Sequence, residues 1–507
     1  MLAILALSAT LASSPASCEG LKSLALPNTT IVAAEMVAAG PYVQPTGRGP
    51  APAGAPAGGG RGGRGPAAPP PQMLPAHCRI DAILRPSPDS EIEMEAWLPE
   101  DWNGKFQFVG GGGWAGIISF PAMVTAVQEG YATASTDTGH KGGNALFAIH
   151  HPEKVIDFAY RAVHETTVQT KAMIAKFYDR GARLSYWNGC STGGRQGLME
   201  AQKYPEDFDA IIAGAPANFQ THLHAWDLTV AVPALKNPAA AVSAAKLNML
   251  SEAAVNACDA QDGVKDGLIN NPRACKFDPS VLLCKGADND TCLTAPQLES
   301  VKRAYATAKF ANGEVVFPGK EPGSETGWGG VLAGQVAPGV SIGSFQVAYN
   351  DANWDAKTFD LDRDLKLTDE KVGTIINATN PDLSAFKAHG GKLLLYHGWN
   401  DTAISPGNSI NYYESVLKKM GGKQDTFVRL FMAPGMQHCG NGPGPNQINY
   451  MAVMERWREG NVTPDTMTAY HVTSNRVDMV RPLCPYPAVA TYKGSGSTND
   501  AANFVCK

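Results

Sequence analysis

The sequence predicts an α/β protein in which a mainly parallel sheet, flanked by helices, is interrupted by one large insertion. Strand-like stretches such as "EIEMEAWLP" and "KFQFVGGGGWAG" alternate with helical stretches up to about residue 219, and strands joined by helices favour parallel pairing. This order is lost from 220 to 385 and resumes with "KLLLYHGWND" and "FVRLFMAPGMQHC". We therefore expect one core domain over residues 78–219 and 386–507, with an inserted lid domain over 220–385.

The first residues are typical of an exported protein. Residues 1–17 combine an apolar run with small residues, which predicts a signal peptide cleaved near Ala16. Lipidation of Cys18 is the alternative, but the preceding Pro-Ala-Ser is a poor lipobox. Lipidation would also use one of the 10 cysteines and leave an odd number for disulfide pairing. We expect a secreted or periplasmic protein whose cysteines pair in an oxidising compartment.

The overall composition argues against several classes of partner. A hydrophobic fraction of 44% is ordinary for a globular protein, and a net charge of -5 gives no basis for nucleic-acid binding or electrostatic membrane docking. No apolar run is long enough to predict a transmembrane segment. The Gly/Pro/Ala-rich tract at 46–76 predicts a disordered loop, and its Arg-Gly pairs favour an RNA-binding tail only weakly in an acidic protein.

The elements of the core domain follow from their patterns. "EIEMEAWLP" alternates like a half-buried strand, and "YATASTDTGH" is typical of a strand with a polar end. Residues 160–180 predict a helix, with Val168, Ala172 and Ala175 on one stripe. "RLSYWNGC" and "FDAIIAGAPA" predict the strands before and after the next helix.

The junction "YWNGCSTGGRQGLMEAQKYP" carries the strongest indication of chemistry. It begins like a buried strand and continues like a helix, and small residues surround Ser191 at the turn. Such a turn is a nucleophile elbow, in which the backbone bends sharply and exposes the serine hydroxyl above the sheet. The alternative is an ordinary tight turn that contains a serine by chance.

Two residues further along the chain favour the elbow. A serine nucleophile needs a base and an acid that orients it, and these follow in the order Ser, Asp or Glu, then His, after later strands. Asp401 follows "KLLLYHGW" and His438 follows "FVRLFMAPG", so we predict the triad Ser191, Asp401 and His438. The alternative interpretations are that Asp401 is a turn residue and that His438 is an ordinary loop histidine. His397 is a rival base, but because it precedes the acid we assign it to the pocket or to a supporting position.

Backbone groups and two cysteines complete the predicted site. One oxyanion N–H should come from Thr192, and the other from the glycine loop 110–113, which lacks the GK[ST] sequence of a phosphate-binding loop. Cys190 precedes the serine and Cys439 follows the histidine. We favour a disulfide between them, which would tie the elbow to the histidine loop; the alternative is a pair of buried thiols.

An acidic loop in the insertion predicts a metal site. In "ACDAQDGVKDGLINNPRACKFDP", Asp259, Asp262 and Asp266 are hard oxygen ligands of the kind that calcium accepts, although the spacing is not that of an EF-hand. Cys258 and Cys275 bracket the loop and could clamp it. The alternative is a solvated Asp/Gly turn. Because the loop lies in the insertion, we expect a structural ion.

With these residues assembled, the chain resembles the tannase and feruloyl esterase family of α/β-hydrolases, to which the esterase that cleaves mono-hydroxyethyl terephthalate also belongs. The resemblance runs from about Cys78 to the C-terminus and rests on "WNGKFQFVGGGG", "GCSTGGRQGLMEAQKYPEDFDAIIAGAPA", "CDAQDGVKDG", "LLYHGWND", "PGMQHCGNGPGP" and "RPLCPYPAVATYKGSG". It implies an α/β-hydrolase fold with a lid. It also implies a secreted serine carboxylic ester hydrolase that cleaves feruloyl, hydroxycinnamoyl or galloyl esters through an acyl-enzyme, without an organic cofactor.

The resemblance also implies the individual site residues. The triad is again Ser191, Asp401 and His438, with Gly113 and Thr192 supplying the oxyanion N–H groups. The calcium ligands are the carboxylates of Asp259, Asp262 and Asp266 with the carbonyls of Val264 and Leu268. The implied disulfides are Cys18–Cys78, Cys190–Cys439, Cys258–Cys275, Cys284–Cys292 and Cys484–Cys506.

The sequence constrains the identity of the substrate less tightly than the identity of the site residues. In the terephthalate-ester enzyme an arginine in an Ala-Arg-Ser-Trp setting holds the free carboxylate, and no such motif occurs between residues 330 and 370. We therefore expect a small ester of an aromatic acid, with a terephthalate monoester as the alternative. A peptidase and a catalytically inactive calcium-dependent binding protein are the competing functional classes. The aromatic residues of the insertion that could stack on a planar acyl group are Trp226, Trp328, Phe345, Tyr349 and Trp354, although single aromatics more often belong to a core.

Overall fold

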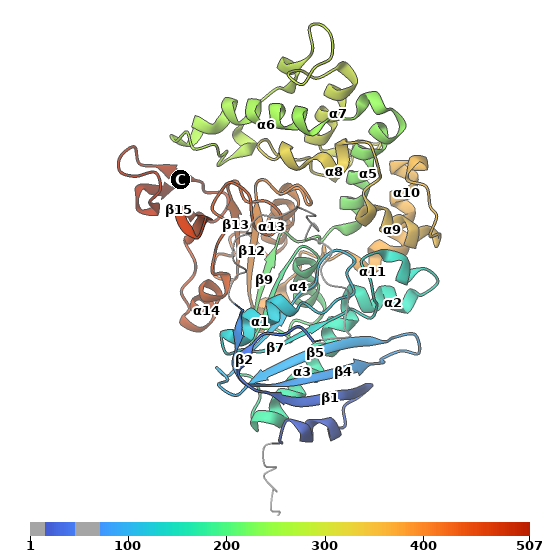
Figure 1. The fold of residues 1–507 in the computed structure, drawn as a ribbon, viewed down its shortest axis with the longest axis vertical. Coiled ribbons are helices and arrows are strands. Elements are labelled where there is room, and N and C mark those ends of the chain that lie inside the picture. Colours follow the sequence, from blue (N-terminus) through green and yellow to red (C-terminus); the bar gives the residue numbers. More distant parts are fainter. Residues whose placement is uncertain (1–15, 46–70) are drawn as a thin grey trace, which may run out of the picture.

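A nine-stranded sheet forms the centre of the molecule (Figure 1). The computed structural model describes residues 16–45 and 71–507, so the predicted signal peptide lies almost wholly outside the described residues, as does the tract 46–70. The strands in spatial order are β1 (Thr29–Val37), β4 (His77–Leu84), β5 (Ile92–Pro99), β7 (Ala132–Thr136), β6 (Lys105–Val109), β8 (Leu184–Cys190), β9 (Ala210–Gly214), β12 (Lys392–Gly398) and β13 (Val428–Ala433). From β7 to β13 all neighbours are parallel, whereas β1, β4, β5 and β7 pair antiparallel.

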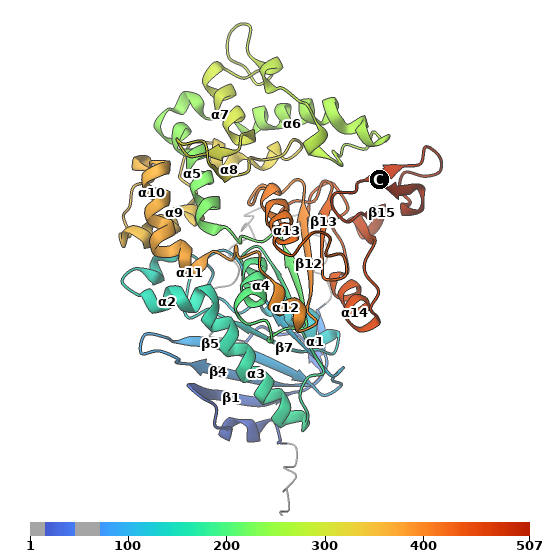
Figure 2. The ribbon, with the colours of Figure 1, turned by 180° about the vertical axis from the view of Figure 1, so that it is seen from behind.

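Helices cover both faces of the sheet, as the fold class predicts. On the face seen in Figure 2, α3 (Ala162–Tyr178), α4 (Thr192–Lys203), α12 (Ser384–Ala388) and α13 (Gly407–Lys419) share one hydrophobic core with the strands. On the opposite face lie α1 (Phe120–Gln128) and α14 (Tyr450–Gly460). Because both faces are covered, β9 and β13 are buried at every residue, which explains the continuous apolar sequence of β9 and the apolar residues of β13 on both sides of Arg429.

The helix predicted at 160–180 forms, but its buried face differs from the prediction. Val168 is 40% exposed and Ala175 is also exposed, whereas Thr166, Thr170 and Met173 are buried. The threonines lie against the sheet with their methyl groups available for packing, so the face turned to the core is less apolar than the stripe that the pattern suggested.

The stretch predicted as an irregular insertion is a helical block with a core of its own. Its elements are α5 (Gln220–Lys236), α6 (Ala244–Cys258), α7 (Ala295–Tyr305), β10 (Ala308–Lys309), β11 (Val315–Phe317), α8 (Gly329–Leu332), α9 (Gly339–Tyr349), α10 (Leu361–Thr368) and α11 (Thr374–Ile376). Buried residues such as Leu250 and Val301 form its core. Figures 1 and 2 both show α6, α7 and α8 beyond the carboxyl ends of β9, β12 and β13, with α9 and α10 to one side.

The two ends of the chain extend the core domain beyond the predicted boundaries. The strand β1, which precedes the predicted start at residue 78, pairs with β4, and the disulfide Cys18–Cys78 ties this edge together. The predicted loop 46–76 also ends earlier than expected, because β3 (Met73–Leu74) pairs with β2 (Gly40–Pro41) and Leu74 is buried. The remaining elements are α2 (Pro152–Ile156), the hairpin β14 (Met467–Thr473) and β15 (Arg476–Leu483), and the pair β16 (Ala490–Tyr492) and β17 (Phe504–Cys506).

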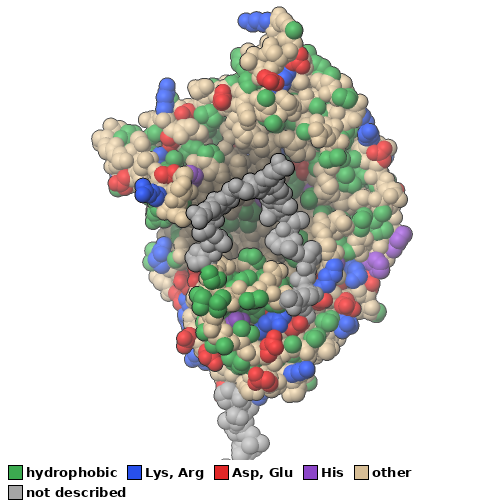
Figure 3. Space-filling view, viewed as in Figure 1, with side chains coloured by type: hydrophobic (Ala, Val, Ile, Leu, Met, Phe, Trp, Pro, Cys, Tyr) green, Lys and Arg blue, Asp and Glu red, His purple; other side chains and the backbone are tan. Residues whose placement is uncertain are grey.

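The described helices and the charged side chains on the surface bear on whether the protein binds a membrane or a nucleic acid. None of the described helices has the length and apolarity that crossing a bilayer requires. On the face shown in Figure 3, basic and acidic side chains are interspersed, and neither sign gathers into a patch.

Candidate active site

Ser191 occupies a sharp turn between β8 and α4 near the middle of the parallel strands. Its φ is 63° and its ψ is -123°, a strained conformation for a residue other than glycine. The close approach that the turn requires explains two glycines. A Cβ on Gly189 would lie 2.7 Å from the backbone of Gly193, and one on Gly110 would lie 2.6 Å from the Gly193 Cα. The small residues at the elbow therefore permit the contact of strand, helix and glycine loop.

Asp401 and His438 lie in loops that follow β12 and β13, the strands beyond β9. The Asp401 carboxylate accepts a 2.7 Å hydrogen bond from His438 Nδ1, and its other oxygen accepts bonds from the backbone N–H groups of Ala403 and Ile404 at 2.8 and 2.9 Å. A carboxylate only accepts, so Nδ1 of His438 carries a proton and Nε2 is the acceptor nitrogen of the neutral ring. Burial raises the pKa of Asp401, but the charge and hydrogen bonds of the two histidines hold that pKa well below its usual range.

His397 contacts Asp401 in the interior of the protein. It is fully buried, and its Nε2 lies 3.0 Å from Asp401 Oδ2 and 3.1 Å from the carbonyl oxygen of Ile404. Both partners are acceptors, so Nε2 donates, and Nδ1 accepts from the Ser409 hydroxyl at 2.7 Å. The prediction of a supporting position agrees with this geometry, and the prediction of a pocket residue was wrong because no part of the ring is exposed.

A cavity of about 430 Å³ contains Ser191 and His438 at its surface together with Gly113 and Thr192. The Thr192 hydroxyl donates to the carbonyl of Gly113 at 2.9 Å, which joins the glycine loop to the first turn of α4. Thr192 begins this helix, where backbone N–H groups are free to bind an anion. The residues predicted for the oxyanion hole therefore border the same cavity as the serine.

The structure contains all five disulfides that the resemblance implied. Cys190 and Cys439 are bonded, with their Cα atoms 5.9 Å apart and 249 residues apart in the sequence. This bond joins the residue before Ser191 to the residue after His438, so it links the two loops that carry these side chains.

The aromatic residues predicted to stack on the substrate lie elsewhere. None of them borders the cavity; instead they pack in or against the core of the helical block: Trp226, Trp328, Phe345, Tyr349 and Trp354. Their rings contact one another and neighbouring side chains, as with Phe345, which stacks on Trp354 at a centroid distance of 5.1 Å. Burial within the block satisfies these rings, so this prediction was wrong.

The cavity is lined instead by one face of α5 and by residues of the α8–α9 region. Gln220, Leu223, His224 and Asp227 have the spacing i, i+3, i+4 and i+7, which places them on one face of α5. Opposite them are Val331, Val340 and Ser341, with Ile404 beside the acid loop. This periodicity was visible in "QTHLHAWD" and could have indicated a helix face with polar functions.

Asp227 is the acidic side chain of this cavity wall. It accepts a 2.6 Å hydrogen bond from the Ser341 hydroxyl. Burial raises the pKa of Asp227 to about 6, against the opposing effects of the Lys320 charge and the Ser341 bond. Nearby, burial lowers the pKa of His224 to about 3, so this ring is neutral at pH 7 while its Nδ1 lies 2.7 Å from Ser344 Oγ.

The acidic loop brings together donors of the kind that calcium prefers, without a compact carboxylate cage. Asp259 accepts backbone N–H bonds from Asp266 and Gly267, both at 3.1 Å, and the charges of Asp259 and Asp266 raise the pKa of Asp262 after the larger effect of burial. Among residues 16–45 and 71–507, the three carboxylates do not form a group whose ligand atoms all lie within 4.8 Å. The donor set fits a hard cation that also takes backbone carbonyls.

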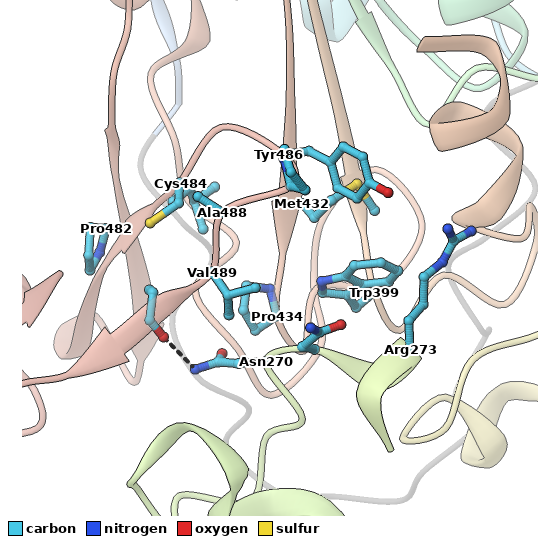
Figure 4. A pocket seen from close by; sticks show the side chains of 14 residues that line it. Asn270, Arg273, Trp399, Met432, Pro434, Pro482, Cys484, Tyr486, Ala488 and Val489 are labelled. Carbon is cyan, nitrogen blue, oxygen red and sulfur yellow. Dashed lines mark hydrogen bonds between the residues drawn. The ribbon is translucent and has the colours of Figure 1, made fainter. Parts of the chain in front are cut away.

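The acidic loop also connects the helical block to the C-terminal segment. Arg481 donates to Asp266 at 2.7 Å, and Asn270, which hydrogen-bonds Asp262, also reaches the carbonyl of Ala490 at 3.4 Å. Figure 4 shows this junction, where a cavity of about 190 Å³ lies between Asn270 and the C-terminal segment. Ser191 and His438 do not border this second cavity.

Comparisons with known proteins agree with this geometry. The family model "Tannase and feruloyl esterase" matches residues 78–507. An uncharacterized esterase of Xanthomonas campestris pv. campestris is 36% identical over 98% of this chain and 92% of its own length. Feruloyl esterase B of Aspergillus niger is 33% identical over 85% of this chain and 86% of its own length.

The solved structures extend the comparison to the fold. The crystal structure of feruloyl esterase B from Aspergillus oryzae has a TM-score of 0.89 and 31% identity, and the match covers 97% of this chain and 99% of that one. The tannin acyl hydrolase of Aspergillus niger, at 22% identity and a TM-score of 0.75, shares the fold. The chain therefore belongs to the tannase and feruloyl esterase family and is a carboxylic ester hydrolase.

Proposed function

We propose that the protein is a secreted serine esterase that hydrolyses esters of hydroxylated aromatic acids. The observation that carries this proposal is the single cavity bordered by Ser191, His438 and Asp227, with Asp401 behind the histidine. The same cavity is also lined by apolar side chains that include Leu223 and Val340. An aromatic acyl group fits such walls, and a phenolic hydroxyl can donate to a carboxylate.

The chemistry follows from the arrangement of the triad. His438 Nε2 takes the hydroxyl proton as Ser191 Oγ attacks the ester carbonyl, and the backbone N–H groups of Gly113 and Thr192 stabilise the oxyanion. His438 then protonates the departing alcohol, which leaves an acyl-enzyme. Water, deprotonated by the same histidine, attacks that acyl group, and the acid is released as Ser191 regains its proton. Asp401 keeps the ring in the required tautomer throughout.

The charge of the cavity favours phenolic acids over terephthalate monoesters. The described residues that line the cavity include no arginine or lysine, but they include Asp227. A free carboxylate on the acyl group would approach Asp227 and be repelled, because like charges in a desolvated site disfavour binding. A neutral phenol meets no such repulsion.

A structural calcium ion and an extracellular location are part of the proposal. The carboxylates of Asp259, Asp262 and Asp266, with the carbonyls of Val264 and Leu268, would hold the ion and neutralise the acidic loop. Five disulfides are typical of proteins that fold outside the cytosol. This agrees with the predicted leader.

A panel of esters tests the proposed substrate class. We expect kcat/KM to be higher for methyl ferulate, methyl gallate and chlorogenate than for mono-hydroxyethyl terephthalate. Methylating the 4-hydroxyl of methyl ferulate should lower kcat/KM by about 10-fold or more, the worth of one hydrogen bond to a charged group. Asp227→Asn should reduce this discrimination. Equal rates on methyl ferulate and its methyl ether would refute the role of Asp227, and preference for the terephthalate monoester would refute the substrate class.

A further inference from the structure

A cluster of candidate metal ligands lies at the opposite end of α4 from Ser191. His164 belongs to α3, Glu200 to the last turn of α4, and Asp207 to the loop before β9. One ligand atom from each lies within 4.8 Å of the other two. His164 Nδ1 is 2.6 Å from Asp207 Oδ2. None of these residues borders the cavity that contains Ser191.

Glu200 is the unusual member of this cluster. Its side chain is 1% exposed, and within the described part of the chain no N–H or O–H donor satisfies either carboxylate oxygen, which instead neighbours the carboxyl group of Asp207. Within the same residues, no lysine or arginine forms an ion pair with Glu200, and the nearby Lys171 ammonium is directed at the carbonyl of Asp207, 2.5 Å away. Burial, the charge of the neighbouring Asp207 carboxylate and a hydrogen bond with that carboxyl group raise the pKa of Glu200 well above its usual range, against the opposing charge of Lys171. A buried carboxylate that no donor satisfies and that faces a second carboxyl group is costly, so a bound cation or a shared proton is expected there.

The donor chemistry identifies the ligand. One imidazole and two carboxylates suit Zn²⁺ or Mn²⁺, and the C-terminal end of a helix favours a cation. The His164 ring is held in place by stacking on Tyr204 at a centroid distance of 3.7 Å, and its side chain is 27% exposed, which leaves a path for an ion. We propose that His164, Glu200 and Asp207 bind a divalent transition-metal ion, separately from the acidic loop.

The position of the site indicates a structural role. A bound ion would join α3 to the C-terminal end of α4, the helix that begins directly after the nucleophile. It would hold that helix against the sheet without approaching the ester. The competing explanation is a proton shared between Glu200 and Asp207, which would satisfy the same carboxylate without metal.

Metal titration of the full-length protein separates these explanations. Chelator-treated protein is first returned to excess CaCl2, which occupies calcium sites, and is then titrated with ZnCl2 and with MnCl2. We expect calorimetry to give one ion per chain, and saturation to raise the melting temperature by about 2–4 °C. Glu200→Gln and His164→Ala should each lose this binding and this shift. His151→Ala is the matched control, because His151 is an exposed histidine beside a single carboxylate, that of Asp89.

Two results would overturn the proposal. One is a wild-type protein that neither binds Zn²⁺ or Mn²⁺ nor gains stability from them, which would favour the shared proton. The other is an unchanged response in His164→Ala together with a lost response in His151→Ala, which would identify surface binding. If Glu200→Gln does not fold, His164→Ala alone decides, since its partly exposed side chain can be removed with less disturbance.

Discussion

Removing the Cys190–Cys439 disulfide should impair catalysis before it unfolds the protein. The bond spans 249 residues of sequence, and the chain-entropy model gives a link of that length a stabilisation of about 5 kcal/mol. It also joins the loops that carry Ser191 and His438, and the latter must keep its 2.7 Å bond to Asp401. A displacement of about 1 Å in such a geometry can cost on the order of 10²-fold in rate.

The assay compares two double variants. Cys190→Ala/Cys439→Ala is measured against Cys284→Ala/Cys292→Ala, which removes a disulfide that spans 8 residues in the helical block. The control should lose about 2–3 kcal/mol of stability and keep its turnover. Both are assayed for kcat and KM on one ester at a temperature where circular dichroism shows each variant folded. We expect kcat to fall on the order of 10-fold to 10²-fold in the first variant alone.

Either of two outcomes would refute a catalytic role for this disulfide. Wild-type kcat in folded Cys190→Ala/Cys439→Ala would show that packing alone positions the two loops. An equal loss of kcat in both variants would show that general loosening, and not the local tie, causes the effect.

The remaining predictions concern single residues. Ser191→Ala should abolish ester hydrolysis while circular dichroism and the melting temperature stay near wild type; residual turnover at the wild-type rate would exclude the assignment. His397→Gln should lower kcat about 10-fold with little change in KM, since it removes one charged hydrogen bond from the acid. The folded pKa of Asp227, about 6, exceeds its unfolded value, so wild-type stability falls as pH rises from about 4 to about 6. Asp227→Asn, which does not titrate, should therefore be the more stable protein above pH 6, by up to about 2–3 kcal/mol in urea unfolding. Asp259→Asn should abolish the calcium-dependent rise in melting temperature and leave kcat at 25 °C nearly unchanged, because Asp259 does not border the cavity that contains Ser191.

The residues of the proposed triad could be selected from the sequence because each belongs to a local pattern. The elbow at Ser191 needs small neighbours at fixed offsets, and Asp401 and His438 each follow an apolar strand directly. Local rules determine such turns, and the parallel sheet brings the carboxyl ends of its strands to one edge. The positions of these residues in the structure thus follow from chain order and strand direction.

The cavity wall could not be predicted by the same means. An aromatic side chain such as Trp328 can stack on a ligand or fill a core, and only the packing of the helical block decides between them. The lining from α5 depends on how that helix is rotated about its axis, which is set by contacts far along the chain. The same reason explains why the buried face of α3 was predicted wrongly: Thr166, and not Val168, packs inward.

The strand β1 was missed for a different reason. Its sequence, "TTIVAAEMV", precedes the glycine-rich tract, and its partner β4 lies beyond it. An edge strand with one exposed face carries a weak pattern, and pairing across a long separation leaves no local signal. Only the cysteines at 18 and 78 linked the two segments in the sequence.

The sheet and the helical block have separate hydrophobic cores, and this bears on how substitutions can alter the selectivity of the enzyme. Ser191, Asp401 and His438 stand on loops of the sheet, whereas Asp227, Val331 and Ser341 belong to the helical block, whose buried residues form a separate cluster. Substitutions at the lining positions of α5 and α9 alter the cavity wall directly, whereas substitutions in the core of the block also affect the Asp401 loop, because Ile404 packs in that core and donates its N–H to Asp401. Selectivity between phenolic and other acids should therefore be adjustable through α5 and α9 while kcat on a preferred ester is retained. The Cys190–Cys439 disulfide supports this retention of kcat, because it fixes the loops of Ser191 and His438 to each other, whereas the Asp401 loop is also held to the block by the hydrogen bond from Asn400 to Gly323.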